Sequence, residues 1–105
     1  MALEKLDILI LKALDQAPLH GYGIGQRIEQ MSGGVFRITL GSLYPALQRL
    51  EQRGHVKGSW SASDNNRRAR YYTLTRAGRQ RLSAGLKAWE RTVTAMVRVL
   101  RAGAE

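Results

Sequence analysis

Apolar residues recur every three or four positions in three segments of the first half of the chain. Residues 3–16, 21–31 and 39–53 each show this spacing, which predicts three amphipathic helices. Glycine marks the ends of the later two, since Ser32-Gly33-Gly34 follows the second helix and Gly54 follows the third. Short polar connections therefore separate three helices within about fifty residues.

The pattern changes after the third helix. Residues 55–60 and 70–74 are short runs rich in residues that favour strands, and they predict a β-hairpin. The segment between them, residues 61–69, is rich in Ser, Asp and Asn, which are good turn formers. Residues 35–38 form a further short extended segment. The hairpin carries several arginines and forms a basic arm.

A last long helix is expected to begin after Thr75, a suitable N-cap. Its apolar residues alternate at spacings of four and three, as in the seam of a coiled coil. We expect this seam to pair two protomers through Leu82, Leu86, Trp89, Val93, Met96 and Leu100. The expected organisation is one domain over residues 1–74, formed by the three helices and the hairpin, and a C-terminal dimerisation helix over residues 75–105.

The first helix is apolar on more than one side. Ile8 and Leu11 lie well away from the stripe formed by Leu6, Ile10 and Ala13. A helix that is apolar on several sides is buried on several sides. In so small a protein we expect a partner chain to cover the second side, so Ile8 and Leu11 are assigned to the dimer interface.

The third helix has a clear buried stripe and one irregularity. Leu40, Leu43, Leu47 and Leu50 keep the spacing of a core-facing helix. With Thr39 as N-cap, Pro45 would lie beyond the first turn, so the regular helix starts nearer residues 41–42 or is kinked at the proline.

Charge is concentrated in the same region. The 105 residues carry 17 Lys and Arg against 8 Asp and Glu, a net charge of +9. Residues 49–81 hold nine basic and two acidic residues, so 9 − 2 = +7 of that charge lies in about a third of the chain. A one-sign block in a globular sequence indicates a polyanionic partner: DNA, RNA or an anionic membrane.

Several classes of function find no support. Cysteine is absent, which removes thiolate chemistry and suits a reducing cytoplasm. His20 and His55 lie far apart without paired carboxylates, so we expect no enzyme activity, metal or cofactor. No apolar run approaches ~20 residues, no signal peptide is expected, and the last helix has too narrow an apolar seam for a membrane surface. We therefore expect a cytoplasmic protein.

The order of elements predicts the fold. Two short helices separated by a turn, followed by a basic hairpin, are typical of a winged helix-turn-helix whose second helix enters the DNA major groove. The predicted fold class is α+β, mainly α with a small hairpin, with an N-terminal helix and a long C-terminal dimerisation helix. The recognition helix spans residues 39–53 and the wing residues 57–72.

The sequence resembles the PadR-type bacterial transcriptional regulators, in the short subclass with a single C-terminal helix and no extended C-terminal domain. The resemblance covers most of residues 5–82. It is carried by an ordered set of segments: HGYGI at 20–24, GSLYPAL at 41–47, RLE at 49–51, Gly54, and RRARYYTLTRAG at 67–78. One departure is His55, where members usually carry an apolar or aromatic residue.

The resemblance implies a homodimeric repressor that is released by a small effector, with the first and last helices forming the dimer interface. It also favours Tyr72 as the inward-facing member of the Tyr71–Tyr72 pair. A tryptophan placed like Trp89 lines the dimer groove in this family, where flat aromatic ligands can stack. An effector pocket for an aromatic or hydrophobic molecule at Ile8, Leu11 and Trp89 is therefore a hypothesis, against simple interface packing of Trp89.

Candidate DNA contacts lie on the third helix and the wing. Arginines 67, 68 and 70 repel one another, which phosphate contact explains, although Arg70 has the alternative of pairing within the strand. Tyr44 either bonds a phosphate or packs under the wing, and Gln48 and Arg49 either read base edges or form a solvated face. The candidate contacts are Tyr22, Ser42, Tyr44, Pro45, Gln48, Arg49, Lys57, Arg67, Arg68 and Arg70.

An operator in double-stranded DNA is the expected partner. The alternative is a basic winged-helix module that binds RNA or a protein instead. RNA binding usually recruits exposed aromatic residues, and here most aromatic residues fall on apolar stripes, which favours DNA.

Overall fold

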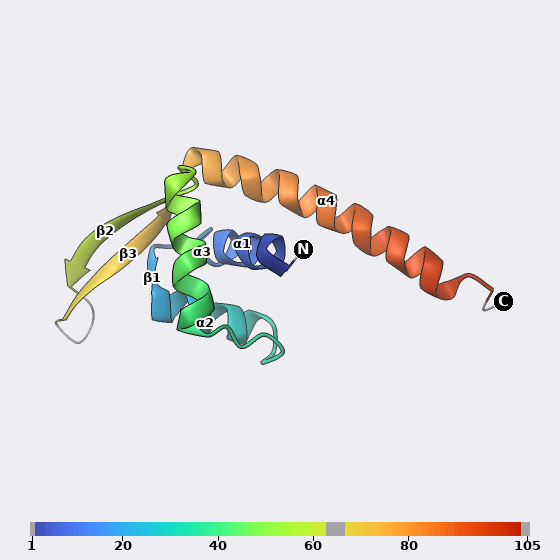
Figure 1. The fold of residues 1–105 in the computed structure, drawn as a ribbon, viewed down its shortest axis with the longest axis horizontal. Helices are drawn as coiled ribbons and strands as arrows, with labels where there is room; N and C mark the ends of the chain where they lie inside the picture. The colour runs from blue at the N-terminus through green and yellow to red at the C-terminus, as the bar shows by residue number, and fades with distance from the viewer. Residues whose placement is uncertain (1, 63–66, 104–105) are drawn as a thin grey trace.

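The computed structural model describes residues 2–62 and 67–103, so the centre of the expected turn, residues 63–66, lies outside it. Four helices and three strands follow one another along the chain (Figure 1). Their bounds are α1 Ala2–Ala13, β1 Leu19–His20, α2 Gly21–Met31, α3 Leu40–Gln52, β2 Val56–Ala62, β3 Arg68–Leu74 and α4 Arg76–Arg101. This is the predicted α+β winged helix.

Side-chain caps begin three of the helices. The backbone N–H of Gly23 donates to His20 Nδ1 at 3.0 Å at the start of α2, and Ser42 N–H donates to Thr39 Oγ1 at 3.2 Å at the start of α3. Each cap satisfies a backbone donor that the first turn leaves free. Gly33 and Gly34, with φ of 65° and 85°, turn the chain after α2, as the sequence predicted.

Helix α3 passes through Pro45. Thr39 is its N-cap, so the regular helix begins at Leu40, earlier than the start at 41–42 that we considered. Leu43, Leu47 and Leu50 are buried as predicted. Leu40 is not: it is exposed, because the first turn of α3 lies at the rim of the fold, where Leu40 lines a shallow hollow with Tyr22 and Ile38.

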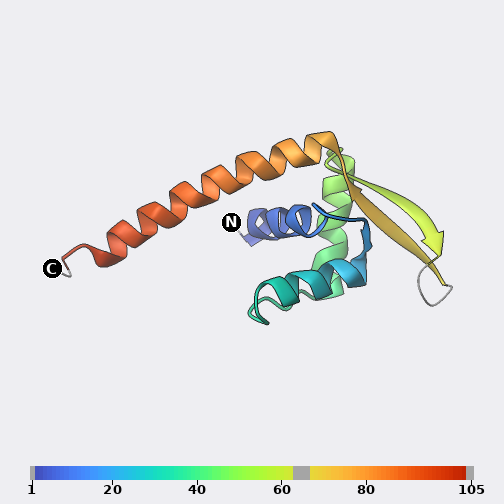
Figure 2. The same cartoon turned by 180° about the vertical axis from the view of Figure 1, so that it is seen from behind.

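Helix α1 is the centre of the molecule. It contacts α2, α3 and α4, which surround it (Figures 1 and 2). Leu11 is completely buried in the single chain and belongs to the hydrophobic core with Ile10, Leu14 and Leu47. Its assignment to the dimer interface and to an effector pocket is therefore wrong, because helices of the same chain already cover that side of α1.

The sheet has three antiparallel strands in the order β1-β3-β2. The expected hairpin is present, with Val56 opposite Leu74 and Trp60 opposite Arg70. The third strand was not predicted: Leu19 pairs with Tyr72 and His20 with Tyr71, which ties the start of α2 to the wing. Residues 35–38, by contrast, which were expected to form a short extended segment, belong to no strand of the sheet.

The two ends of the molecule project in opposite directions. The β2–β3 hairpin extends to one side of the helices, and α4 extends far beyond them to the other (Figures 1 and 2). The overall extents are 59 × 28 × 22 Å. The part of the fold that carries the wing is thus separated from the part that carries the apolar seam.

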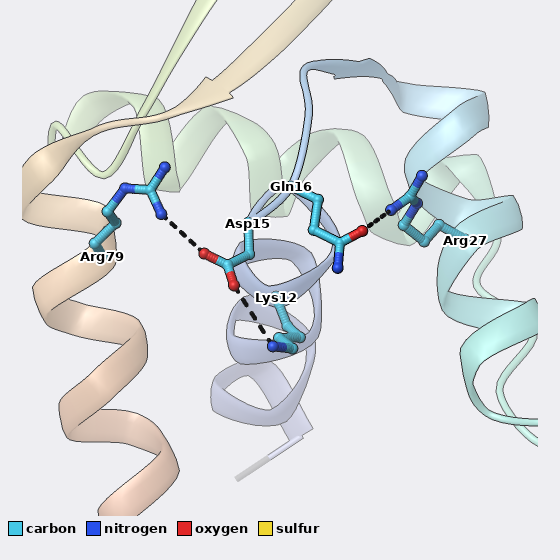
Figure 3. Close-up of polar contacts among 5 residues, drawn as sticks. All are labelled: Lys12, Asp15, Gln16, Arg27 and Arg79. Carbon is cyan, nitrogen blue, oxygen red and sulfur yellow. Dashed lines mark hydrogen bonds and ion pairs between the residues drawn. The ribbon is translucent and has the colours of Figure 1, made fainter.

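Polar contacts hold the end of α1 to both neighbouring helices. Asp15, just after α1, accepts from Arg79 of α4 at 2.9 Å and lies 3.5 Å from Lys12 (Figure 3). Arg27 of α2 donates to Gln16 at 3.5 Å. These exposed pairs contribute little energy individually, but they connect α1, α2 and α4 at one point.

Candidate nucleic-acid interface

A hollow of about 560 Å³ lies between the start of α2, the first turns of α3 and the wing. Five candidate DNA contacts that are scattered in sequence line it together: Tyr22, Tyr44, Arg67, Arg68 and Arg70. His20, Gly21, Trp60, Ala69 and Tyr72 complete its lining. The hollow therefore combines aromatic rings with cationic side chains on one side of the molecule.

The start of α2 positions the two tyrosines. Tyr22 is 60% exposed, and its hydroxyl accepts from Gln26 one turn later at 3.2 Å. Tyr44 lies directly over Gly21, where an added Cβ would stand 2.8 Å from the tyrosine ring. Only a glycine leaves room for this approach, so the Gly21-Tyr22 pair and Tyr44 form one surface.

The exposed face of α3 continues that surface. Ser42, Pro45 and Gln48 are exposed together with Tyr44, and the Ser42 hydroxyl accepts from Thr39 Oγ1 at 3.2 Å. These four side chains belong to the first two and a half turns of α3. Such a short polar segment is what a recognition helix offers to base edges and phosphates.

Arg70 is held rigidly in the wing. Its guanidinium pairs with Glu51 of α3, and the same carboxylate accepts from Gly58 N–H at 3.3 Å. It also lies 5.9 Å from the ring centres of both Trp60 and Tyr72. Arg70 lines the hollow, but its charge is partly used inside the chain, in agreement with the pairing alternative, although the partner is on a helix and not in the strand.

Tyr72 is the inward tyrosine, as expected. It is buried at the base of the wing while Tyr71 lies on the opposite face. Burial raises the pKa of the Tyr72 phenol above its ordinary value of 10.0, and the neighbouring Arg70 charge opposes this shift. Tyr72 is therefore uncharged at neutral pH and adds no negative charge to the hollow.

Two of the candidate contacts are placed elsewhere. Arg49 turns towards α1 and lies 3.5 Å from the buried carboxylate of Asp7, which also lies 3.8 Å from Arg53. This corrects the expectation that Arg49 reads base edges, because a buried carboxylate needs its cationic partners. Lys57 lies on the face of β2 opposite to Trp60, so it does not line the hollow.

Trp60 is the site residue that the sequence analysis missed. It is 56% exposed, lies in the hollow, and has the Arg68 guanidinium 5.2 Å from its ring centre. The sequence did carry a signal for Trp60, because it is an aromatic residue in the arm that also carries three arginines. It has no apolar neighbour in the chain that would explain it as a core residue. It also weakens the argument against RNA, because Tyr22, Tyr44 and Trp60 are exposed aromatic residues and not core residues.

The seam of α4 divides into a buried and an open part. Leu82 is buried in the core of its own chain. The prediction that it lies in the dimer interface is therefore wrong. From Leu86 onward the seam is open: Leu86, Trp89, Val93, Met96 and Leu100 are all exposed in the single chain. The difference arises because only the first turns of α4 lie against α1.

The close approach of α4 to α1 occurs at Gly85. An added Cβ there would stand 2.8 Å from Ile8 Cδ1, so Ile8 lies between the two helices and is half-buried. One turn later, Lys5 Nζ lies 5.5 Å from the Trp89 ring centre. Ile8 and Trp89 are thus near neighbours along the α1–α4 contact, whereas Leu11 is not part of that surface.

The described part of the chain holds neither a metal cluster nor a membrane-spanning helix. No group of three or more His, Asp or Glu side chains there is arranged to hold a metal ion. None of its helices combines the length and the apolar character needed to cross a membrane.

Two solved structures illustrate the similarity of the fold to known proteins. A PadR family transcription regulator from Clostridium difficile has a TM-score of 0.78 and 29% identity, covering 90% of this chain and 97% of that one. Bacillus subtilis PadR in complex with operator DNA has a TM-score of 0.68 and 27% identity, covering 77% of this chain and 46% of that one.

Sequence comparison agrees. An uncharacterized 37.1 kDa protein in transposon TN4556 of Streptomyces fradiae is 43% identical over 82 residues. This match covers 78% of the present chain but only 22% of that relative. The pattern of the transcriptional regulator PadR-like family matches residues 10–84. The chain therefore belongs to the PadR-like family of transcriptional regulators, which are DNA-binding proteins and not enzymes.

Proposed function

We propose that this chain is a homodimeric, sequence-specific regulator that binds operator DNA through α3 and the wing. The observation that carries the proposal is the hollow that gathers Tyr22, Tyr44 and the wing arginines beside the exposed start of α3. A helix in the major groove and a basic hairpin on the adjacent backbone would place one DNA strand in that hollow.

The roles of the contact residues follow from their chemistry. Arg67 and Arg68 are exposed and bind phosphates, and Tyr22, Ser42 and Tyr44 supply hydroxyl groups at the start of α3. Gln48 lies one turn further along the exposed face of α3, where its amide group would reach a base edge such as that of adenine.

The open seam of α4 supports the homodimer. Five large apolar side chains exposed along one helix form the kind of patch that a second copy covers. Two copies would then present two α3 helices to successive major grooves about 34 Å apart. In this arrangement residues 1–74 bind DNA and the later turns of α4 hold the protomers together.

We further propose repression of the target promoter, release by a small aromatic effector at the α1–α4 contact near Ile8 and Trp89, and action in the cytoplasm. The exposed indole of Trp89, with Lys5 beside it, supports such a site. The test is a Trp89→Ala variant that remains dimeric. If it still responds to every effector found for the parent protein, Trp89 is not part of the effector site.

The experiment for DNA binding is a selection from a random duplex library by the purified protein, followed by titration of the enriched duplex at several salt concentrations. We expect a motif with two half-sites one helical turn apart. Replacing Arg67 and Arg68 with Ala should weaken binding and reduce the salt slope by about one unit per lost phosphate contact.

The matched control removes the same charge elsewhere. Arg91 and Arg98 lie on the exposed part of α4, away from the wing, and replacing both with Ala should leave the salt slope almost unchanged. An equal loss in both double variants would show that only net charge matters and would contradict the proposed site.

A second candidate function is binding of single-stranded RNA, which the three exposed aromatic residues of the hollow favour. A single-stranded RNA of the same length, added as competitor, distinguishes the two. Displacement of the selected duplex at equal concentrations would favour RNA, and retention of the duplex would favour DNA.

A further inference from the structure

Trp60 is a large exposed aromatic residue that is not among the proposed contacts to duplex DNA. It lies in the middle of β2, opposite Arg70 of β3, on the face of the hairpin that lines the hollow. Residues i and i+2 share a face of a strand, so Trp60 lies on the same face as Val56 and Gly58, further from the core. Its exposure is therefore a consequence of the wing extending beyond the helices.

The indole is nevertheless held in place. The Arg68 and Arg70 guanidinium groups lie 5.2 and 5.9 Å from its ring centre, and Arg70 is anchored to Glu51 of α3. Cation–π contacts of this kind favour a defined position of the ring. The indole is 56% exposed, so a ligand can reach it.

The neighbours of Trp60 define what it is prepared to bind. Across the hollow are Tyr22 and Tyr44, and beside it are Arg67 and Arg68. Phosphate oxygens accept hydrogen bonds from arginines, tyrosine hydroxyls and an indole N–H, while the flat ring face matches the apolar carbons of a sugar. A sugar–phosphate strand supplies both kinds of group in alternation.

We propose that Trp60 is a DNA-backbone contact, with its ring packed against a deoxyribose and its Nε1–H donating to a phosphate oxygen of the strand seated in the hollow. The inference deepens the proposed function and rests on it. It adds an uncharged contact to a wing whose other contacts are arginines.

This contact has a distinct physical signature. Arginine–phosphate contacts release counterions, so their loss changes both affinity and salt slope. Loss of a ring–sugar contact and one hydrogen bond should lower the affinity about tenfold and leave the salt slope as it was. If the wing bound DNA through charge alone, no variant of it would lower the affinity without also changing the salt slope.

The test uses the full-length protein and the duplex selected by it. Trp60→Ala should bind about tenfold more weakly at every salt concentration, whereas Trp60→Phe, which keeps a ring but loses the N–H, should lie between it and the parent. Ser59→Ala, on the opposite face of the same strand, should bind like the parent protein. Thermal unfolding of each variant establishes that it is folded.

Tryptophan fluorescence supplies a readout that a structural role would not move. Titration with the duplex should change the emission of the parent protein, and most of that change should be lost in Trp60→Phe. A change that persists in Trp60→Phe would be due to Trp89 and would overturn the proposal.

Different results would refute the Trp60 contact and the proposed DNA-binding function. If Trp60→Ala binds like the parent protein while the Arg67 and Arg68 double variant is weakened, the wing contacts DNA without Trp60 and this inference is wrong. If the library yields no enriched duplex, the proposed function itself fails.

Discussion

A single glycine decides the shape of the candidate binding surface. Gly21 is the first residue of α2, and the ring of Tyr44 from α3 lies against it with no space for a methyl group. The atoms in the way belong to the far end of the tyrosine side chain, so they can move. A substitution at Gly21 is therefore expected to alter binding more than folding.

We predict that Gly21→Ala displaces Tyr44 and weakens binding of the selected duplex about fivefold to tenfold, with thermal stability almost unchanged, since the helix propensity of Ala offsets the contact. Gly25→Ala is the matched control, because a Cβ there meets only the Ile38 carbonyl oxygen at 3.8 Å. Titration and thermal unfolding of both variants check this. Parent-like binding by Gly21→Ala would mean that Tyr44 does not contact DNA.

At the scale of elements, Thr75 joins three of them. Its Oγ1 accepts from Gly78 N–H at 3.0 Å, which caps α4, and its hydroxyl donates to the Gly54 carbonyl at 2.7 Å, just after α3. Its backbone N–H donates to the His55 carbonyl at 3.2 Å. One side chain thus fixes the start of the long helix relative to the recognition helix.

We predict that Thr75→Ala lowers the free energy of unfolding by about 1–2 kcal/mol, because it removes the cap and leaves the Gly54 carbonyl without this donor. Thr75→Ser keeps the hydroxyl and should lose only a small part of this. Chemical denaturation of both variants measures the difference. Equal losses in the two would show that the threonine methyl group matters and the hydroxyl does not.

In the molecule as a whole, the elongated shape places the proposed DNA-binding surface and the proposed dimer interface far apart. The wing and α3 form a charged end, and the outer turns of α4 form an apolar end at the opposite side of a body 59 Å long (Figure 1). Only Leu82 and Gly85 of the α4 turns are buried beyond its start. Beyond Gly85 no residue of α4 is buried by its own chain, which is why we expect a second copy.

We predict that Val93→Glu converts the dimer to monomers, because it places an unpaired charge in the seam. Ala95→Glu adds the same charge on the other side of the helix and should remain dimeric. Analytical ultracentrifugation of both variants and the parent protein decides the matter. A Val93→Glu protein that sediments as a dimer would place the interface elsewhere.

Most of the elements were predictable because their signals are local. Helix α2 has the predicted bounds, and both the N-cap role of Thr75 and the glycine stop after α2 follow from a few neighbouring residues. The inward position of Tyr72 rests instead on the family resemblance. Caps and periodicity act over about four residues, so the sequence displays them directly.

The errors concern contacts between distant residues. Leu11 lies on a helix that is apolar on more than one side, which predicts a partner chain, but three helices of its own chain surround it. Arg49 pairs with Asp7, 42 positions away, and β1 pairs with β3, about 50 positions away. A pattern within a few neighbouring residues cannot reveal contacts between residues so far apart in the chain.

The helices, the Thr75 cap, the hairpin, the basic segment and the apolar seam of α4 were predictable, because they depend on periodicity, turn chemistry and charge along a short stretch of chain. Which apolar faces are covered within one chain, and which arginines are used in ion pairs, became visible only in the folded chain. The same holds for the hollow in which Trp60 meets Tyr22 and Tyr44. The reason is that burial and pairing depend on how many neighbours the fold brings to a residue, and those neighbours come from remote parts of the chain.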